Sequence, residues 1–249
     1  QRSIELFKQM AIKINMEDIS LAQVISTAAG SRMDGEQVGS LVGDALGFLK
    51  NTKEKKGMIN LKKSIFLINN PMLDDRAFDG IVIQKQLFGQ QIPDNLDNTK
   101  TVLLKIDLKE IKESLVREMK NYDEIVRMKD LQSKMTKDIS DSICKTGAGI
   151  VFIASAHADE QLLANLLEKN ILMIHVSIEE LLNIANALNM QVVRRKEDIG
   201  EVSVGSFKSV YYDEENGLFF LENRAQKKMV TIVIGGVTKV TSQERWRTV

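Results

Sequence analysis

Short apolar runs alternate with amphipathic stretches through the middle of this 249-residue sequence. Four of the runs are almost continuously apolar, which is typical of strands covered on both faces of a sheet. These runs are 81–83, 102–106, 150–153 and 171–176. Apolar residues at helical spacing predict helices over 159–169 and 177–188. From about residue 80 onward the pattern therefore predicts an α/β fold.

The N-terminal part of the sequence follows a different pattern. Residues 4–50 carry apolar stripes at helical spacing and predict a set of helices. The polar run 51–57 predicts a linker, and a β segment is expected over 58–68. Gly39, Gly43 and Gly47 lie inside the last predicted helix, where close packing is expected to offset their low helix propensity. A helical part thus precedes the α/β part.

Turn and cap signals define two further elements. Ser177 followed by Glu180 is a capping box, which marks the start of the helix over 177–188. Asn189 can adopt the left-handed conformation that ends it. Residues 202–233 alternate as strands do, and Asn216-Gly217 predicts a two-residue hairpin turn between them.

The stretch from Asp107 to Gly147 joins two predicted strands and is much longer than the roughly twelve residues that a crossover needs. One interpretation is an ordinary long core helix with its preceding loop. The other is a helical arm whose tip exposes Met, Ile and Val among charged residues, as an adaptable binding surface does. Periodicity alone does not decide between these two interpretations. It does place four residues on one helical face: Leu131, Met135, Ile139 and Ile143.

Composition and charge narrow the class of protein. The sequence is 43% hydrophobic and 27% charged, as in soluble globular proteins, and it has 34 basic and 34 acidic residues. This balance gives no overall field that favours nucleic acid or an anionic membrane, so neither is expected as a partner. No signal peptide or membrane-spanning run is visible.

Cys144 is the only cysteine, which fits a cytoplasmic protein, and we expect it to be buried and inert. Because the chain begins at Gln1 and stops in a charged run, it is interpreted as an excised segment.

A search for catalytic or metal-binding groups finds few candidates. His157 and His175 have no partner at metal-ligand spacing, so structural roles are expected for both. Gly147-Ala-Gly149 precedes a strand, whereas a dinucleotide-binding loop follows one. Asp74-Asp75 are adjacent carboxylates in a turn and suit a cap better than an acid/base pair. No catalytic residue and no metal site are predicted.

Several motifs, in collinear order, resemble group II chaperonins, the family of the archaeal thermosome and the eukaryotic TRiC/CCT. Gly80-Ile-Val-Ile-Gln-Lys85 is similar to the opening of their apical domain, and Thr146-Gly-Ala-Gly-Ile-Val151 follows the long helix as it does there. Ile232-Val-Ile-Gly-Gly236 resembles the closing I-L-I-R-G-G, without its Arg. Leu41-Val-Gly-Asp-Ala45 is similar to the L-V-V-D-A of the intermediate domain.

The resemblance implies a mixed α/β and α+β fold in two domains. One is an apical-domain-like β-sandwich flanked by helices, with a long helical protrusion; the other is a small helical and β intermediate domain. Residues 1–78 would begin the intermediate domain, 79–236 would form the apical substrate-binding domain, and 237–249 would return to the intermediate domain. The protrusion would span about 107–147, with a stem over 131–143 packed toward the domain.

The resemblance also implies functional positions. On helix 177–188, Leu181, Ile184, Ala185 and Leu188 would face the core, and four other residues would face a substrate groove: Glu180, Asn183, Asn186 and Ala187. The protrusion tip would add apolar contacts for substrate from Met119, Ile125, Val126 and Met128. A hinge is expected beside Gly235 and Gly236, since glycine permits backbone rotation.

By the same resemblance, the segment would bind unfolded or partly folded polypeptides and form the built-in lid of an ATP-driven double ring of sister subunits. ATP and Mg would belong to the full-length parent, because this sequence lacks the G-D-G-T-T-T loop of the family. The family's catalytic Asp follows an E-R-A-L-type run, whose counterpart here is Glu244-Arg-Trp-Arg247 with no Asp after it. No cofactor and no ATPase activity are therefore expected of the segment itself.

Two alternatives of other classes remain. The segment could be a non-catalytic chaperonin-like module that regulates a larger protein such as a phosphoinositide kinase. It could also be a small-molecule α/β enzyme, which the lack of clustered polar residues at the strand ends disfavours.

Overall fold

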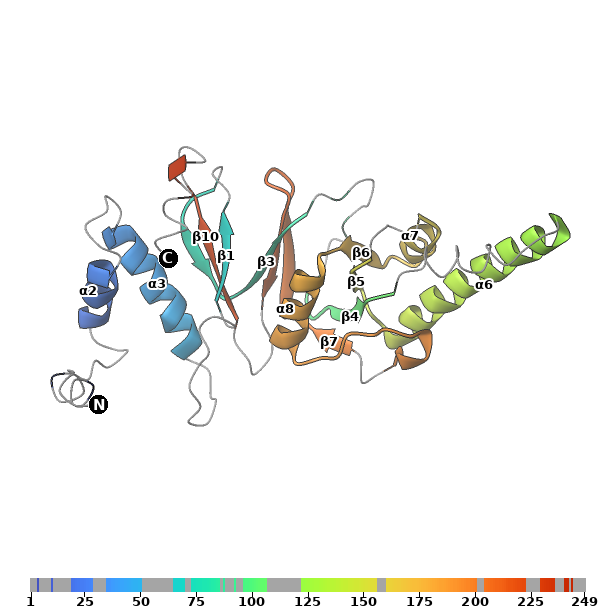
Figure 1. Cartoon of the computed structure of the whole chain (residues 1–249), viewed down its shortest axis with the longest axis horizontal. Helices are drawn as coiled ribbons and strands as arrows, with labels where there is room; N and C mark the ends of the chain where they lie inside the picture. Colours follow the sequence, from blue (N-terminus) through green and yellow to red (C-terminus); the bar gives the residue numbers. More distant parts are fainter. Residues whose placement is uncertain are drawn as a thin grey trace. The chain divides into compact units, whose positions relative to one another are not determined.

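The computed structural model describes residues 4, 10, 19–28, 35–50, 65–69, 73–85, 87, 92, 96–106, 122–155, 160–200, 204–222, 229–235, 240, 241 and 243. The chain divides into two compact units (Figure 1). Unit 1 comprises Gln1–Lys53, Ser64–Asp79 and Val230–Val249, and unit 2 comprises Glu54–Lys63 and Gly80–Met229.

Unit 1 combines helices with a three-stranded sheet in the order β1-β10-β2. β1 (Ile65–Asn69) runs parallel to β10 (Val230–Ile234), and β2 (Arg76–Phe78) pairs antiparallel on the other side of β10. The helices α2 (Ile19–Ala28) and α3 (Gly35–Lys50) confirm part of the helical prediction for 4–50. Successive turns of α3 bring apolar side chains to one face, where they pack with alternate residues of β10. This core contains Leu41, Ala45, Leu49, Val230, Ile232 and Ile234.

The last boundary between the units along the chain differs from the expected one. The sequence suggested a return to the first domain at residue 237, whereas the structure places the boundary between Met229 and Val230. The reason is strand pairing: β1 and β2 hold β10 between them, so β10 belongs to their sheet. The crossing between Asp79 and Gly80 lies one residue from the expected position.

Gly39 of α3 is buried, whereas Gly43 and Gly47 differ from the expectation of close packing. A Cβ atom added at Gly43 or Gly47 would have no other atom within 4 Å beyond its own neighbours on the helix. Close packing of the helix against a neighbour therefore does not explain these two glycines, and that prediction is wrong for both positions.

The described part of unit 2 contains two sheets. One has the order β6-β5-β4-β7 and is parallel through β4 (Lys100–Leu104), β5 (Ile150–Ile153) and β6 (Leu172–His175). β7 (Val204–Ser206) joins its edge antiparallel. All residues of β5 are buried, which confirms the prediction of strands covered on both faces. The other sheet is antiparallel, in the order β3-β9-β8.

The antiparallel sheet comprises β3 (Gly80–Gln84), β8 (Ser209–Asp213) and β9 (Leu218–Glu222). The predicted hairpin joins β8 and β9, but Asp213 pairs with Leu218 and the turn has four residues, 214–217, instead of two. The Asp213 carboxylate accepts a hydrogen bond from the backbone N–H of Asn216 at 3.2 Å. Gly217 has a φ of 63°, a left-handed conformation that glycine adopts readily. The side chain of Asp213 thus stabilises the wider turn.

In the described part of unit 2, three helices and a short 3₁₀ turn accompany the sheets: α6 (Tyr122–Thr146), α7 (Glu160–Leu167), α8 (Ile178–Leu188) and η1 (Lys196–Asp198). The capping box of α8 is present as predicted, with Ser177 and Glu180 in reciprocal hydrogen bonds, and Asn189 closes the helix at φ 51°. Among the described residues no helix, α6 included, combines the length and apolarity needed to cross a membrane.

Candidate functional site

The C-terminal half of α6 is fixed in the core of unit 2. Ile139 and Ile143 are almost completely buried, with Thr136 and Ser140 beside them on the same helical face. The two isoleucines pack with buried residues of the parallel sheet and α7, among them Val102, Leu104, Val151, Leu162 and Leu166. Thr136 satisfies its hydroxyl locally by donating to the carbonyl of Gln132 at 2.9 Å. This half of the helix is therefore a stem.

The N-terminal half of α6 leaves that core. Leu131 is 57% exposed and Val126 is 44% exposed, whereas Met135 is partly buried against the core. The packed part of the stripe therefore begins near Met135, and the expectation that the stem starts at Leu131 is wrong. Figure 1 shows α6 extending past α7 at this end. A side-chain hydrogen bond of 2.7 Å from Gln161 of α7 to Ser133 of α6 lies close to where the helix emerges.

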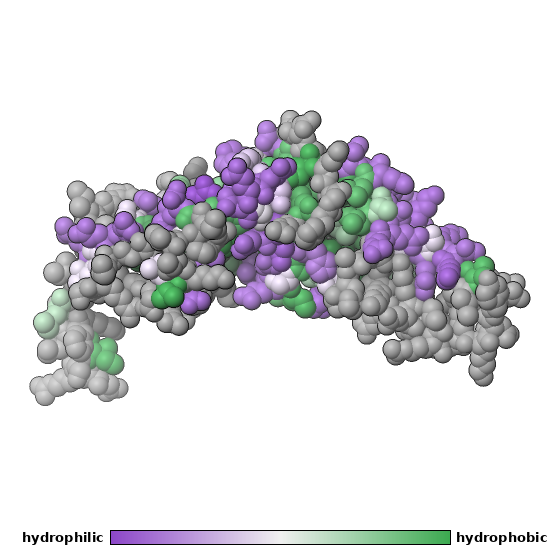
Figure 2. All heavy atoms as spheres, turned by 90° about the horizontal axis from the view of Figure 1, so that it is seen from above, coloured by the Kyte–Doolittle hydropathy of each residue, from purple (hydrophilic) through white to green (hydrophobic). Residues whose placement is uncertain are grey.

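Of the four predicted tip residues, the structure describes one side chain. Val126 is exposed, as the prediction requires. Ile125 and Met128 lie on α6, but their side chains lie outside the described part, as does all of Met119. Figure 2 shows a described surface that is largely hydrophilic, with hydrophobic residues in small groups.

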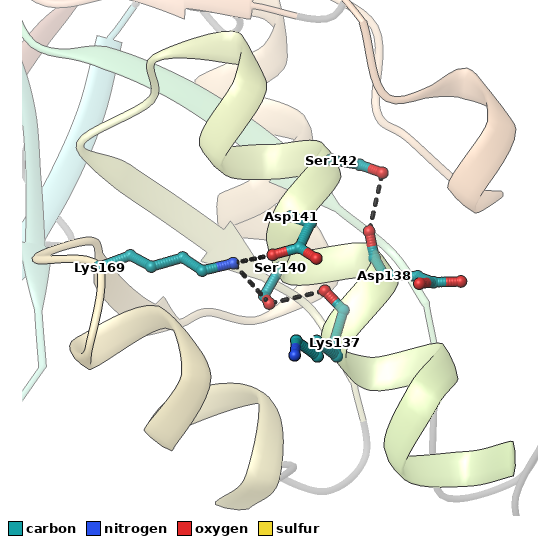
Figure 3. A network of polar contacts seen from close by, with 6 residues as sticks. All are labelled: Lys137, Asp138, Ser140, Asp141, Ser142 and Lys169. Atoms are coloured by element: carbon teal, nitrogen blue, oxygen red, sulfur yellow. Dashed lines mark hydrogen bonds and ion pairs between the residues drawn. The ribbon is translucent and has the colours of Figure 1, made fainter.

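Two ion pairs attach the stem to neighbouring elements. Lys169, in the turn after α7, pairs with Asp141 and donates a hydrogen bond of 3.1 Å to the Ser140 hydroxyl (Figure 3). Lys196 of η1 pairs with Asp138 at 2.7 Å. The two carboxylates lie three residues apart on α6 and reach different elements, so the stem is held from two sides.

These contacts lower the pKa values of both carboxyl groups. The hydrogen bond from Lys196 holds the pKa of Asp138 below its ordinary value of 3.8. The hydrogen bond from Lys169 does the same for the pKa of Asp141. A carboxyl group with a depressed folded-state pKa stabilises the fold above its ordinary pKa and loses this contribution as the pH falls through the folded value.

We therefore expect the double variant Asp138→Asn/Asp141→Asn to melt at a lower temperature than the parent chain at pH 7 in low salt. The difference should shrink as the pH falls below about 4, because the parent then loses the same charges. Added salt should also reduce it, since exposed pairs are screened. Thermal melts at several pH values measure this, and a difference that persists at pH 2 would contradict the assignment.

Helix α8 presents the second candidate surface. Leu181, Ile184, Ala185 and Leu188 are buried, as the sequence predicted. Ala187 is also fully buried, so the expectation that it faces a groove is wrong; it lies three residues after Ile184 and shares the inner face. Asn186 is exposed, and Asn183 and Glu180 are half-buried. Glu180 is engaged in the cap and in an ion pair with Lys85 at 3.2 Å.

Sequence reasoning missed the apolar part of this surface. Ile178 is 51% exposed and Leu182 is 50% exposed, and their i, i+4 spacing puts both on one side of α8 with Asn186. The signal was available, since neither residue belongs to the stripe that packs inward. Polar and apolar groups thus share the outer face of the helix.

The predicted hinge glycine lies in a tightly packed position. Gly235 is the residue directly after β10. The chain enters unit 1 at the other end of this strand, at Val230. It is buried, and its N–H donates to the Asp75 carboxylate at 2.7 Å. A Cβ here would lie 1.7 Å from the carbonyl oxygen of Leu73. Glycine is therefore required for close approach, which gives no support to a hinge at Gly235; Gly236 lies outside the described residues.

The remaining candidates were expected to have structural roles. His175 lies 3.2 Å from the Ser155 hydroxyl at the end of the parallel sheet, and His157 is outside the described residues. Cys144 is exposed, contrary to expectation, because it is one residue past the buried Ile143 on the helix. The Asp75 carboxylate accepts the hydrogen bond from the Gly235 N–H, which is a structural contact between distant segments. Within the described ranges no group of His, Cys, Asp and Glu residues could hold a metal.

Comparison with known proteins gives a consistent result. The model of the TCP-1/cpn60 chaperonin family matches residues 1–249. A thermosome subunit of Methanocaldococcus jannaschii is 25% identical over 98% of this chain and 46% of its own length. A thermosome subunit alpha of Aeropyrum pernix is 22% identical over 100% of this chain and 47% of its own length. The chain thus spans about half the length of these relatives.

Two solved structures share the fold. The open-state monomer of a group II chaperonin from Methanococcoides burtonii superposes with a TM-score of 0.72 at 15% identity, covering 99% of this chain and 58% of that one. A group III chaperonin in the open state gives a TM-score of 0.77 at 17% identity, covering 99% of this chain and 50% of that one.

Proposed function

The chain belongs to the TCP-1/cpn60 chaperonin family, and from this we propose that it binds non-native polypeptides and contributes to the lid of a chaperonin. The match to thermosome subunits confirms the resemblance to group II chaperonins that the motifs indicated. The mixed α/β architecture agrees with the fold of the chaperonin structures.

The observation that carries the proposal is the division of α6 into a buried stem and an exposed outer half. A helix that leaves its own core with Leu131 and Val126 exposed has apolar groups free for other chains. Ile178 and Leu182 on α8 add a second exposed apolar pair in the same unit. Non-native polypeptides expose apolar side chains, which such surfaces bind by excluding water.

We assign the parts accordingly. Unit 2 would be the apical domain, with α6 as its protrusion and the outer face of α8 as a substrate-binding surface. Unit 1 would be the intermediate domain. In the full-length parent the units would act within a cytoplasmic ring of sister subunits driven by ATP with Mg. Because this sequence lacks the nucleotide-binding loop of the family, we place the ATP site in other parts of the parent.

The proposal predicts that the 249-residue chain suppresses aggregation of a chemically unfolded client, measured by light scattering on dilution from denaturant. Ile178→Gln/Leu182→Gln should weaken this suppression several-fold, because it removes two exposed apolar contacts. Tyr211→Gln is the matched control, since it removes a single exposed residue that is 64% accessible on β8.

Equal loss in both variants would contradict the role of α8. Failure of the parent chain to suppress aggregation would contradict the proposed function itself. No ATP turnover is expected, so measurable hydrolysis by the purified chain would contradict the assignment of ATPase chemistry to other parts of the parent.

The alternative of a regulatory module in a lipid kinase gains no support from the relatives, which are thermosome subunits. A kinase domain encoded downstream of this segment would revive it.

A further inference from the structure

Two basic residues of unit 2 lie side by side where the chain returns to the parallel sheet after α8. Val193 forms a parallel bridge with Leu104. Its N–H donates to the carbonyl of Leu103 and its carbonyl accepts from the N–H of Lys105, each at 2.8 Å. The residues that follow Leu104 and Val193 are Lys105 and Arg194. Because the two segments run parallel, these two residues are also neighbours, at the strand spacing of about 5 Å.

Both basic side chains point away from the core. Leu104 and Val193 belong to the buried cluster that packs against α6 and α7. Because side chains alternate along extended backbone, Lys105 and Arg194 face away from that cluster. Both are exposed. They form a basic pair on the other face of the sheet.

The basic pair is not neutralised within the described part of the chain. Like charges on neighbouring strands repel each other, and no described acidic residue forms an ion pair with Lys105 or Arg194. Some lysines of unit 2 do pair with a carboxylate, as Lys169 does with Asp141 and Lys196 does with Asp138. The sequence has as many acidic as basic residues, so a shortage of carboxylates does not explain the difference.

The basic pair and the exposed apolar residues of α8 lie at the same edge of the sheet. Leu104 of β4 pairs with Ile153 of β5, and Ile153 pairs with His175 of β6. The residue after β4, Lys105, therefore lies at the same level of the sheet as the residue after β6, Val176. Ile178 begins α8 two residues later. β4 and β6 are two strands apart, which corresponds to about 10 Å. An extended peptide covers that distance with about three to five residues.

We propose that Lys105 and Arg194 bind carboxylates of an acidic segment in the captured polypeptide, while Ile178 and Leu182 contact apolar residues three to five positions away. The guanidinium of Arg194 binds a carboxylate through two parallel hydrogen bonds, and Lys105 adds a second positive charge. Two cations on a chain of zero net charge suit a short carboxylate segment better than a nucleic acid, whose binding involves many phosphate contacts. This inference deepens the proposed function and rests on it.

The test measures fluorescence anisotropy of a labelled, extended peptide of Leu and Glu residues binding to the 249-residue chain. We expect Lys105→Gln/Arg194→Gln to raise the Kd about tenfold in low salt. The control Lys100→Gln/Lys145→Gln removes two exposed positive charges from other sites and should leave the Kd within about twofold. A peptide with Gln in place of Glu should bind the parent chain more weakly and be insensitive to Lys105→Gln/Arg194→Gln.

Other outcomes would overturn the inference. Equal weakening by the two double variants would show only a general charge effect. Equal binding of the Glu and Gln peptides would exclude carboxylate recognition, and tighter binding of a single-stranded oligonucleotide through the same pair would assign it to phosphate. If the proposed function itself fails, neither peptide binds and the client still aggregates; if only this inference fails, both peptides bind equally and aggregation is still suppressed.

Discussion

Ile143→Ala is expected to lower the free energy of unfolding of unit 2 by about 2–5 kcal/mol. Ile143 is completely buried in the stem of α6, among residues of the parallel sheet and α7. Truncation removes its apolar contacts and leaves a cavity in a core that relaxes only in part. Urea unfolding followed by circular dichroism measures the change.

The matched control is Leu131→Ala on the same helix and the same predicted stripe. Leu131 is mostly exposed, so its truncation should change the free energy of unfolding by no more than about 0.5 kcal/mol. Comparison of the two variants distinguishes the buried stem of α6 from its exposed outer half. Similar losses of stability in the two would mean that the outer half of α6 is packed in solution, and the division proposed for this helix would be wrong.

Gly235→Ala is expected to destabilise unit 1 by about 1–3 kcal/mol, the usual range for forcing an extra methyl group into a packed site. The new Cβ would meet the carbonyl oxygen of Leu73, a backbone atom that moves only with its loop. Movement of this loop would also strain the hydrogen bond from the Gly235 N–H to Asp75. Thermal unfolding of the chain measures the effect.

Gly43→Ala provides the opposite expectation within unit 1. The position lies inside α3 and has open space for a Cβ, so alanine should stabilise the helix by about 0.5–1 kcal/mol. If Gly235→Ala were as stable as the parent chain, the close approach of Leu73 would not exist in solution. If both variants were destabilised alike, a general intolerance of substitution in unit 1 would be the simpler explanation.

The elements that sequence predicted well are those with strong local signals. The strands of the parallel sheet were recognisable because nearly every residue in them is apolar, as coverage on both faces requires. The limits of α8 were recognisable because Ser177 and Glu180 satisfy backbone groups within the same four residues.

Features that depend on distant parts of the chain were not predictable in the same way. The assignment of β10 to unit 1 depends on pairing with β1, far away in the sequence. Periodicity placed Leu131 on the correct face of α6 but does not tell where the neighbouring core ends. The hairpin turn widened because the Asp213 side chain hydrogen-bonds to Asn216, a contact that the Asn-Gly signal does not include.

The candidate surface was predicted only in part, for a physical reason. The sequence separates inward from outward residues of α8 by their apolar stripe, but Ala187 is small enough to fit the inner face while Ile178 and Leu182 remain outside. An exposed apolar side chain is informative because most large apolar side chains are buried. The sequence does not give the burial of each residue, so such an exception becomes visible only in the structure.

Site-specific photo-crosslinking tests the central claim most directly. A photoreactive amino acid is placed at Leu131, Leu182 or Tyr211, which are all largely exposed, and the chain is mixed with an unfolding client before illumination. Polypeptide capture by α6 and α8 predicts client adducts at Leu131 and Leu182 and few at Tyr211. Equal adduct formation at all three positions, or none at the two helical ones, would contradict it.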